Sequence, residues 1–341
     1  MSAQMDPGYI MQTATAFWPS KVLLTAVEFD LFTTLGDGSM TAAELGGALG
    51  VHPTRTYDFF DTLVALKFLE RDGDGEAGRY KNTPQTAAFL NAKSPMYIGG
   101  MPKMLNARLF GFWNNLGEAL RTAEPQNELK THGTQIFEEL YADEQKLVQF
   151  LEAMSGVQAG NFHMLGTKFD FSNYKTVSDI GGALAACSVI VAQHQPHLTF
   201  NSFDLPPVAP HAQKNIDGAG LSDRITVMSG DFFADELPAA DVILMGNILH
   251  DWNLERKQIL IKKAYEALPE GGAFIAIENV IDDARRENAF GMMMSLNMLI
   301  ELGDGFDYTG ADFRGWCSAA GFTRFDLIPL AGPTSAAVAY K

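Results

Sequence analysis

A histidine and a glutamate follow two short apolar segments that lie close together in the sequence. Asp241–Met245 leads into Gly246-Asn-Ile-Leu-His-Asp-Trp252, and Ala273–Ile277 ends on Glu278. Apolar runs of this length are typical of fully buried strands. Ligands bind beyond the carboxyl ends of the strands in a parallel sheet, where a histidine and a carboxylate form a candidate acid/base pair. The pattern therefore predicts that His250 and Glu278 meet at one sheet edge.

The residues between these two segments predict the element that positions them. Apolar side chains recur at helical spacing from Asn253 to Leu268, and Pro269-Glu-Gly-Gly272 ends the pattern. Strand, loop, helix, turn and strand make a βαβ unit if both strands join one parallel sheet. Spacing alone also allows a simpler interpretation, in which His250 is a polar loop residue capped by Asp251 and Trp252 is a packing anchor.

Composition excludes several classes of protein. A chain of 341 residues with 47% hydrophobic content predicts two globular domains, and its net charge of −16 disfavours nucleic acid and anionic membranes as partners. It contains no apolar run of about 18 residues, the length of a membrane span. The first residues lack the pattern of a signal peptide, and Cys187 and Cys317 have no motif spacing. We therefore expect free thiols and a cytoplasmic location.

The first hundred residues predict helices and a small β-hairpin. Residues 10–35 read as one or two helices that are apolar on most sides, and such helices need a partner surface. Thr41 and Glu44 fit a capping box at the start of a further helix. A second helix over 54–68 and a glycine-rich hairpin over 69–80 complete a winged helix-turn-helix pattern.

DNA binding is the usual function of such a pattern, but the charges disagree with it. The second helix has Arg55, Asp58 and Asp61, and the hairpin carries more acids than bases. Phosphate contacts need an excess of lysine and arginine. A dimerisation module is therefore the better interpretation, and a DNA-binding regulator is the less favoured one.

Alternating strands and helices predict an open, mostly parallel α/β sheet in the second half of the chain, after a helical region over 83–169. Asp179-Ile-Gly-Gly182 follows the first strand, and Asp204 comes one helix and one strand later. This is a nucleotide-site arrangement, in which an acid accepts the ribose hydroxyls. The G-x-G-x-x-G motif of dinucleotide enzymes is absent, so nicotinamide chemistry is disfavoured.

These motifs together resemble the small-molecule O-methyltransferases of the hydroxyindole and caffeate type, which use S-adenosylmethionine. The resemblance covers nearly the whole chain and rests on Leu249–Trp252, Pro269–Gly272, Asp204–Pro207, Gly230–Phe232, Asn297–Leu299 and Gly321-Phe322. It implies a Rossmann-like class I methyltransferase sheet with an N-terminal α-helical winged-helix dimerisation domain. It also implies a dimerisation domain over 1–95, a helical linker with pocket helices over 96–168 and a cofactor-binding catalytic domain over 169–341.

The resemblance further implies a homodimer, a small aromatic hydroxyl substrate and no metal, nucleic acid or membrane partner. His250 would be the general base, since histidine titrates near neutral pH and a phenol near pH 10, while Glu278 and Asp307 would orient it from two sides. The cofactor would contact Asp179, Gly181, Gly182, Asp204, Leu205, Asp231, Phe232 and Asn247. The substrate would contact Phe150, Met154, Asp251, Met294 and Met298.

Two departures from the family pattern keep other functions open. Ala183 and Ala185 stand where the family commonly has glycines, and Gly305-Phe-Asp-Tyr-Thr309 replaces Gly-Arg-Glu-Arg-Thr. Added Cβ atoms restrict φ and crowd a ligand that approaches the backbone. Methylation of carbon or nitrogen, a non-methylating use of the cofactor and a catalytically silent binding protein therefore remain as alternatives.

Overall fold

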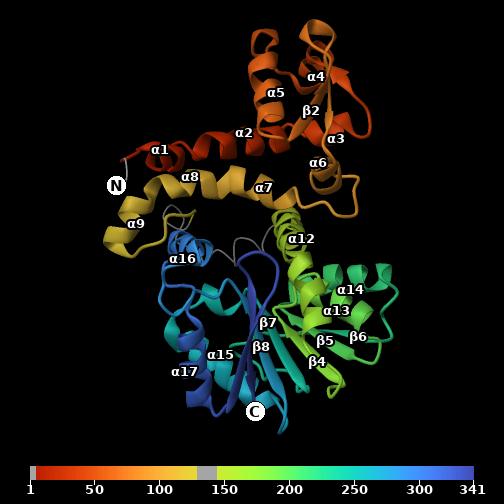
Figure 1. The fold of residues 1–341 in the computed structure, drawn as a ribbon. Coiled ribbons are helices and arrows are strands. Elements are labelled where there is room, and N and C mark those ends of the chain that lie inside the picture. Colours follow the sequence, from red (N-terminus) through yellow and green to blue (C-terminus); the bar gives the residue numbers. More distant parts are fainter. Residues whose placement is uncertain (1–4, 129–143) are drawn as a thin grey trace. The chain divides into compact units, whose positions relative to one another are not determined.

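The computed structural model describes residues 5–128 and 144–341 (Figure 1). Contacts divide the chain into two compact units, Met1–Gly111 and Phe112–Lys341. Residues 129–143 of the region expected to be helical lie outside the described residues. No helix in the described ranges is long and apolar enough to cross a membrane.

The first unit combines short helices with a small three-stranded sheet of order β1-β3-β2, and the sheet is antiparallel. Its core is formed by buried side chains such as Phe32, Leu45, Phe60, Leu63 and Tyr80. The elements are α1 (Gly8–Ala14), α2 (Phe17–Glu28), α3 (Leu31–Leu35), β1 (Met40–Thr41), α4 (Ala42–Leu49), α5 (Thr56–Ala65), β2 (Leu69–Asp72), β3 (Arg79–Asn82), α6 (Pro84–Phe89) and α7 (Gly100–Met104). The short helix α8 (Phe110–Phe112) crosses the boundary between the two units.

Helix boundaries in this unit follow local chemistry. The capping box expected at α4 is present, because Glu44 N–H donates to Thr41 Oγ1 and Thr41 N–H donates to the Glu44 carboxylate. The prediction of one or two helices over 10–35 is wrong, since the structure has three. The break before α3 comes at Asp30, whose φ of 53° is left-handed and cannot continue a helix.

The second unit is built on a seven-stranded sheet of order β6-β5-β4-β7-β8-β10-β9. In this spatial order, the five strands β6, β5, β4, β7 and β8 pair in parallel with their neighbours. Strand β10 pairs antiparallel with both β8 and β9. Its helices are α9 (Leu116–Thr122), α12 (Glu144–Lys168), α13 (Ala186–His194), α14 (Ala209–Gly218), α15 (Leu254–Ala267), α16 (Ala289–Leu302) and α17 (Gly310–Ala320). Its strands are β4 (Thr176–Ile180), β5 (Thr199–Asp204), β6 (Ile225–Ser229), β7 (Val242–Gly246), β8 (Ala273–Glu278), β9 (Arg324–Pro329) and β10 (Ser335–Tyr340).

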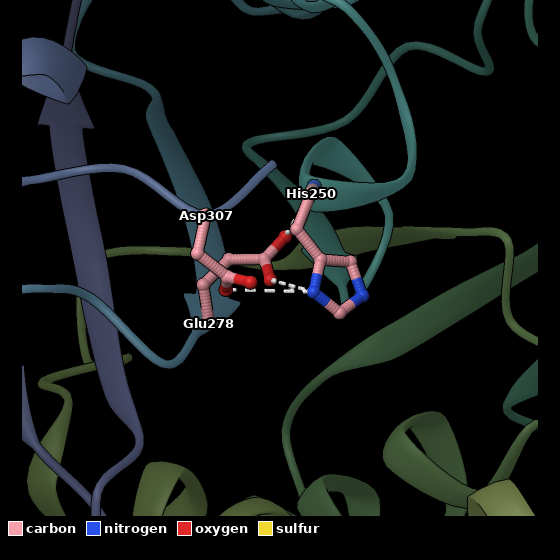
Figure 2. A group of neighbouring side chains, drawn as sticks. All are labelled: His250, Glu278 and Asp307. Carbon is pink, nitrogen blue, oxygen red and sulfur yellow. Dashed lines mark hydrogen bonds and ion pairs between the residues drawn. The ribbon is translucent and has the colours of Figure 1, made fainter. Parts of the chain in front are cut away.

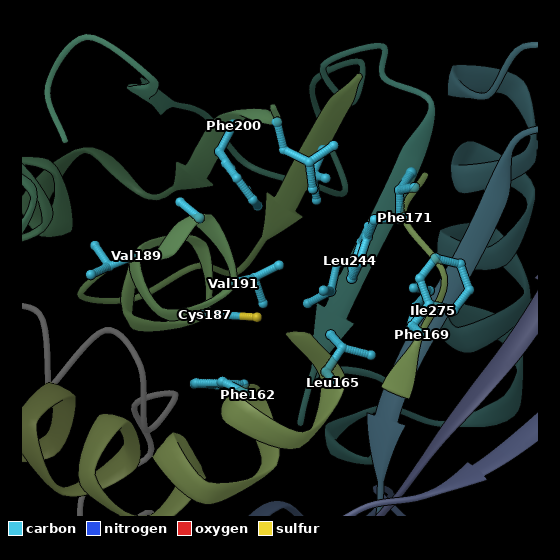
Figure 3. Packing of buried hydrophobic residues seen from close by; sticks show 14 of the residues in the cluster. Phe162, Leu165, Phe169, Phe171, Cys187, Val189, Val191, Phe200, Leu244 and Ile275 are labelled. Carbon is cyan, nitrogen blue, oxygen red and sulfur yellow. The ribbon is translucent and has the colours of Figure 1, made fainter. Parts of the chain in front are cut away.

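Helices cover both faces of this sheet, which explains its continuous apolar strands. Successive strand residues point to opposite faces, so β7 directs Leu244 to one core and Ile243 to the other. On the first face, α12 and α13 contribute Phe162, Leu165 and Val191 (Figure 3). On the second face, α15 and α17 pack together against the strands. The sheet is thereby fixed on both sides, and its carboxyl edge carries the polar residues.

Candidate active site

His250 and Glu278 come from neighbouring strands, as the sequence pattern predicted. Strands β7 and β8 pair in parallel, with Gly246 opposite Ile277, so the loop after β7 begins beside Glu278. That loop contains a short 3₁₀ turn, Leu249–Asp251, and the Glu278 Oε1 atom accepts the backbone N–H groups of Leu249 (3.0 Å) and His250 (3.3 Å). Glu278 therefore holds the backbone of the histidine loop.

Asp307 reaches the same place from a segment that runs beside the end of β8. Ile281 N–H donates to the Tyr308 carbonyl, and the N–H of Asp307 donates to Ser295 Oγ on α16 (3.2 Å). Gly305 lies against the histidine loop, since a Cβ there would come within 2.8 Å of the carbonyl oxygens of His250 and Asp251. Glycine is required at 305 for this close approach.

Both carboxylates face the same imidazole nitrogen (Figure 2). His250 Nδ1 lies 3.6 Å from Glu278 Oε2 and 3.5 Å from Asp307 Oδ1, and Nε2 lies 3.4 Å from Asp251 Oδ1. Glu278 and Asp307 thus share Nδ1, whereas the sequence interpretation had them on two sides of the ring. Asp251, expected at the substrate, occupies the other side.

The cluster is buried and charged. His250, Glu278 and Asp307 are each less than 5% exposed. Burial alone lowers the pKa of His250, but Glu278, Asp251 and Asp307 together outweigh it and raise that pKa to about 10. Burial also raises the pKa of Glu278 to about 7 and that of Asp251 to about 6. The free protein therefore holds a proton on this cluster at neutral pH.

His250, Glu278 and Asp307 could also hold a cation. One ligand atom from each lies within 4.8 Å of the others. Proton sharing by an imidazole and two carboxylates suits the same spacing, and it suits the raised pKa of His250.

The acids expected at the cofactor lie at the ends of β4 and β5. Asp179 is buried on β4, and its Oδ2 atom accepts from Ser188 Oγ (2.8 Å). Asp204 ends β5, and each of its oxygens accepts one backbone N–H, from Ala183 (2.8 Å) and from Leu205 (2.7 Å). Each Asp204 oxygen keeps a lone pair for a further donor.

The turn after β4 is tight and left-handed. Gly181 has a φ of 69°, and a Cβ there would come within 2.3 Å of Ile248. Ala183 and Ala185 also have positive φ, 49° and 56°, in a region that residues with a Cβ enter only at a cost. The two alanines therefore keep the left-handed conformation that glycine adopts readily. Gly182, which lies between Gly181 and Ala183, is buried.

The remaining residues expected at the cofactor occupy two further strand ends. Asp231 follows β6 and accepts the N–H of Phe233, while Phe232 packs edge-on against Trp252, with ring centroids 6.0 Å apart. Asn247 follows β7 with a left-handed φ of 54°, and its Oδ1 atom is buried with no hydrogen-bond partner among the described residues.

This edge fits a donor-rich, positively charged ligand. Asp179, Asp204 and the orphaned Asn247 Oδ1 atom offer acceptors at the carboxyl ends of three parallel strands. The ribose hydroxyls, amino groups and sulfonium charge of S-adenosylmethionine match such a set. Asp204 would hold the ribose, and Asn247 would accept a donor that the free protein lacks.

Residues expected at the substrate are only partly brought together. Met298 is buried and Met294 half-buried on α16, the helix that also holds Asp307 through Ser295. Phe150 lies on α12 and packs against the buried cluster of Leu147, Leu151 and Val208, as do Ala183 and Leu184 of the turn after β4. Met154 is half-buried one helical turn further along α12.

Sequence reasoning missed Lys257, which lies behind the cluster on α15. It is fully buried, and its Nζ donates to the carbonyl of Trp252. The signal was in the pattern, because Lys257 precedes Leu260, Ile261 and Ala264 at the spacing of one helix face, which is buried. Lys257 had no role in the sequence analysis.

Known proteins resemble this chain over most of its length. A family model described as an O-methyltransferase domain matches residues 113–323, and one described as an O-methyltransferase dimerisation domain matches 11–92. A relative from Streptomyces glaucescens, the tetracenomycin polyketide synthesis 8-O-methyl transferase TcmO, is 38% identical and covers 98% of this chain and 97% of its own. The N,N-dimethyltransferase OxyT of Streptomyces rimosus is 33% identical, with 92% and 90% covered.

A solved structure extends the likeness to three dimensions. Human N-acetylserotonin methyltransferase in complex with S-adenosylmethionine superimposes with a TM-score of 0.91 at 28% identity, over 100% of this chain and 99% of that one. Fold and site thus define an S-adenosylmethionine-dependent transferase. The chain belongs to the O-methyltransferase family, with S-adenosylmethionine as its cofactor and a dimerisation domain at its amino end.

Proposed function

We propose that this protein methylates a hydroxyl group of a small aromatic or polyketide-type metabolite, with His250 as general base. The observation that carries the proposal is the His250 imidazole, which has two carboxylates on Nδ1 and lies at the sheet edge where the cofactor acceptors converge. TcmO acts in polyketide synthesis and the human structural neighbour on N-acetylserotonin. An aromatic hydroxyl compound is accordingly the acceptor class that we assign to this chain.

The two imidazole nitrogens have different tasks in this proposal. Nδ1 keeps its hydrogen toward Glu278 and Asp307, which fixes the tautomer and ring orientation and stabilises the imidazolium. Nε2 then takes the proton of the acceptor hydroxyl. Asp251, 3.4 Å from Nε2, lies where it can bind that hydroxyl before the transfer.

The pKa of the base suits its substrate. A phenol has a pKa near 10, and the cluster raises that of His250 to about 10, so proton transfer between them is nearly balanced. When bound, S-adenosylmethionine supplies an activated methyl group on a sulfonium. In this proposal, residues on both sides of the sheet edge hold the hydroxyl oxygen close to that methyl group. Such positioning can lower the barrier by roughly 7–11 kcal/mol.

Transfer of labelled methyl groups tests the proposal directly. The protein is incubated with methyl-labelled S-adenosylmethionine and a panel of hydroxynaphthoates, N-acetylserotonin and polycyclic phenols. We expect label on the oxygen of at least one acceptor and an equal amount of S-adenosylhomocysteine. Tight cofactor binding in calorimetry without product from any hydroxyl compound would contradict hydroxyl methylation.

Methylation of nitrogen is the second candidate, because OxyT, at 33% identity, is an N,N-dimethyltransferase. An amine is itself a nucleophile once neutral, so it depends less on a general base than a hydroxyl does. Aminated analogues of the same acceptors belong in the panel. Faster transfer to the amine than to the matching hydroxyl would favour this candidate.

We also propose that the protein is a homodimer through its first unit and that it acts in the cytoplasm. The dimerisation-domain match covers 11–92, and α1 and α2 carry large apolar side chains that are more than half exposed in the single chain. They are Tyr9, Ile10, Met11, Phe17 and Trp18. Exposed apolar groups of this extent mark interaction surfaces.

A further inference from the structure

Lys257 stands apart from the other cations of the molecule. Among the lysines and arginines whose burial the structure describes, it is the one that is fully buried. Lysine is almost never fully buried unless it is paired, because desolvation of an ammonium is costly. The position of Lys257 therefore needs a specific compensation.

Its compensation comes from two segments that flank the catalytic cluster. Nζ donates to the carbonyl of Trp252, which ends the histidine loop. The same atom lies 3.4 Å from the ring centroid of Phe306 and 6.0 Å from that of Tyr308, which precede and follow Asp307. One ammonium thus joins the segment of His250 to the segment of Asp307 by a hydrogen bond and a cation–π contact.

The charges around this ammonium are predominantly negative. Glu278 on β8, Asp307 and Asp304 on the segment before α17, and Asp251 on the histidine loop all act on it. The segment 303–309 contains two acids and no base of its own. A single imidazole cannot balance the three carboxylates that face it, and Lys257 brings the second positive charge.

We propose that Lys257 is a positioning residue for the methyl transfer: its buried ammonium holds the histidine loop against the Asp307 segment and supplies the positive charge that Glu278 and Asp307 face. This inference rests on the proposed role of His250. The Tyr308 hydroxyl and the Cys317 thiol add no further negative charge nearby, because burial raises the pKa of both and keeps them neutral.

The titration of these groups agrees with the geometry. Burial lowers the pKa of Lys257 to about 8, and Glu278 is the acid that most opposes this effect, followed by Asp307, Asp251 and Asp304. The lysine therefore remains charged while Glu278, with a pKa of about 7, titrates. Coupling between two groups is reciprocal, so loss of the ammonium must raise the pKa of Glu278.

Three substitutions separate charge from packing. Lys257→Met keeps most of the volume without charge or donor, Lys257→Gln keeps a donor for the Trp252 carbonyl, and Lys257→Arg keeps charge and donor. Lys262→Met is the matched control, since Lys262 lies on the same helix but is exposed and paired with Glu266. If Lys257→Met does not fold, Lys257→Gln provides the same comparison.

The first measurement does not depend on turnover. With carbon-13 in the glutamate carboxyl groups, Glu278 is the resonance that disappears in Glu278→Gln, and its midpoint near pH 7 separates it from ordinary glutamates near 4.3. We expect this midpoint to rise by about one pH unit in Lys257→Met and Lys257→Gln. It should stay in place in Lys257→Arg and Lys262→Met. An unchanged or lowered midpoint in both neutral variants would overturn the proposal.

The second measurement uses the best hydroxyl acceptor of the panel. In the neutral variants, the rise of kcat/KM with pH should shift to higher pH by about one unit, as expected for the Glu278 midpoint. This shift lowers the rate roughly tenfold at pH 7. The KM for S-adenosylmethionine should change less than about twofold. A merely structural lysine would lower the rate at all pH values without moving the profile. If no acceptor is methylated, the proposed function fails while the titration of Glu278 still decides the role of Lys257.

Discussion

His250 is the single residue on which the proposed chemistry depends most. In His250→Ala, turnover of a phenol should fall by roughly 10²–10⁴, the usual contribution of general-base catalysis. Affinity for S-adenosylmethionine should hardly change, because the proposed cofactor acceptors are Asp179, Asp204 and Asn247. Raising the pH should partly restore turnover, since the phenolate then forms in solution. His250→Gln, which cannot accept the proton, should behave in the same way.

The simpler interpretation of His250 predicts other results. If the imidazole only holds the loop in place, substitution should lower thermal stability and cofactor affinity together, with no recovery at high pH. Calorimetry, thermal denaturation and initial rates measured on the same preparation distinguish the two. Full activity in a stable His250→Ala protein would remove His250 from the mechanism.

The pH dependence of the native enzyme should differ from that of a free histidine. The active form needs a neutral His250 imidazole, and the three surrounding acids raise its pKa from 6.5 to about 10. The rate must therefore increase as the pH rises above neutrality, because the neutral fraction grows in that range. We expect kcat/KM to keep rising above pH 7, measured with an acceptor whose own pKa lies outside the range. An inflection near 6.5 would show that the acids do not act on His250 in this way.

Asp179 should make stability depend on pH. Its burial raises its pKa from 3.8 to about 6, so the folded protein holds the proton more tightly than the unfolded chain. The contribution of Asp179 to the free energy of unfolding is fully present below about pH 4, and it is lost as the pH rises through about 6. Asp179→Asn should match the native protein near pH 4 and exceed it above pH 6.5 by up to about 3 kcal/mol. Urea unfolding at both pH values measures this, and an equal difference at both would exclude the linkage.

Among the elements, the turn after β4 offers a test of backbone strain. Ala183 and Ala185 have left-handed φ angles, which cost a residue with a Cβ roughly 1–2 kcal/mol each. Glycine removes this strain, but it also gives the unfolded chain more conformational entropy, which lowers the stability of the fold by about 0.4–1 kcal/mol. Ala183→Gly should therefore stabilise the protein by up to about 1 kcal/mol.

Ala185→Gly is the matched comparison for that substitution. Ala185 is fully buried, so glycine there also deletes packing contacts of the methyl group. We expect Ala185→Gly to gain less than Ala183→Gly in chemical denaturation without cofactor. A destabilised Ala183→Gly protein would mean that the methyl group contributes more than the strain removes.

The elements that carry the site were predictable from the sequence because their patterns are local. The apolar runs before Asn247 and Glu278 and the helix between them appear as β7, α15 and β8, with ends that differ by a few residues at most. What the sequence could not give were contacts between distant segments. That Asp307 shares Nδ1 with Glu278 depends on Gly305 and Ser295, which lie against it only in the folded chain.

Lys257 and the two alanines show the same limit in another form. A lysine on an apolar helix face is ordinarily expected to extend to solvent. Its burial depends on Phe306 and the Trp252 carbonyl, which are brought to it by tertiary structure. Alanine likewise prefers right-handed conformations, and the left-handed turn is imposed by the strands that it joins.

For the whole molecule, the exposed apolar face of α1 and α2 predicts self-association. Ile10→Glu combined with Trp18→Glu should convert a dimer to a monomer that still folds, since neither side chain belongs to the core of the first unit. Sedimentation velocity at micromolar concentration measures the change. Leu120→Glu is a control, because Leu120 is an equally exposed apolar residue of the second unit. A native protein that sediments as a monomer would refute the prediction.

The alanines of the turn after β4 also determine how the free protein meets its cofactor. The Ala183 N–H donates to Asp204, and this hydrogen bond must offset the preference of alanine for right-handed backbone if the turn is to stay in the form proposed to receive the ribose. Apparent affinity scales with the fraction of molecules in that competent form. Glycine at 183 enters the left-handed form without that cost, so the substitution that relieves the fold should also raise the fraction of competent molecules and strengthen the binding of S-adenosylmethionine. Strain at Ala183 thus lowers folding stability and cofactor affinity together.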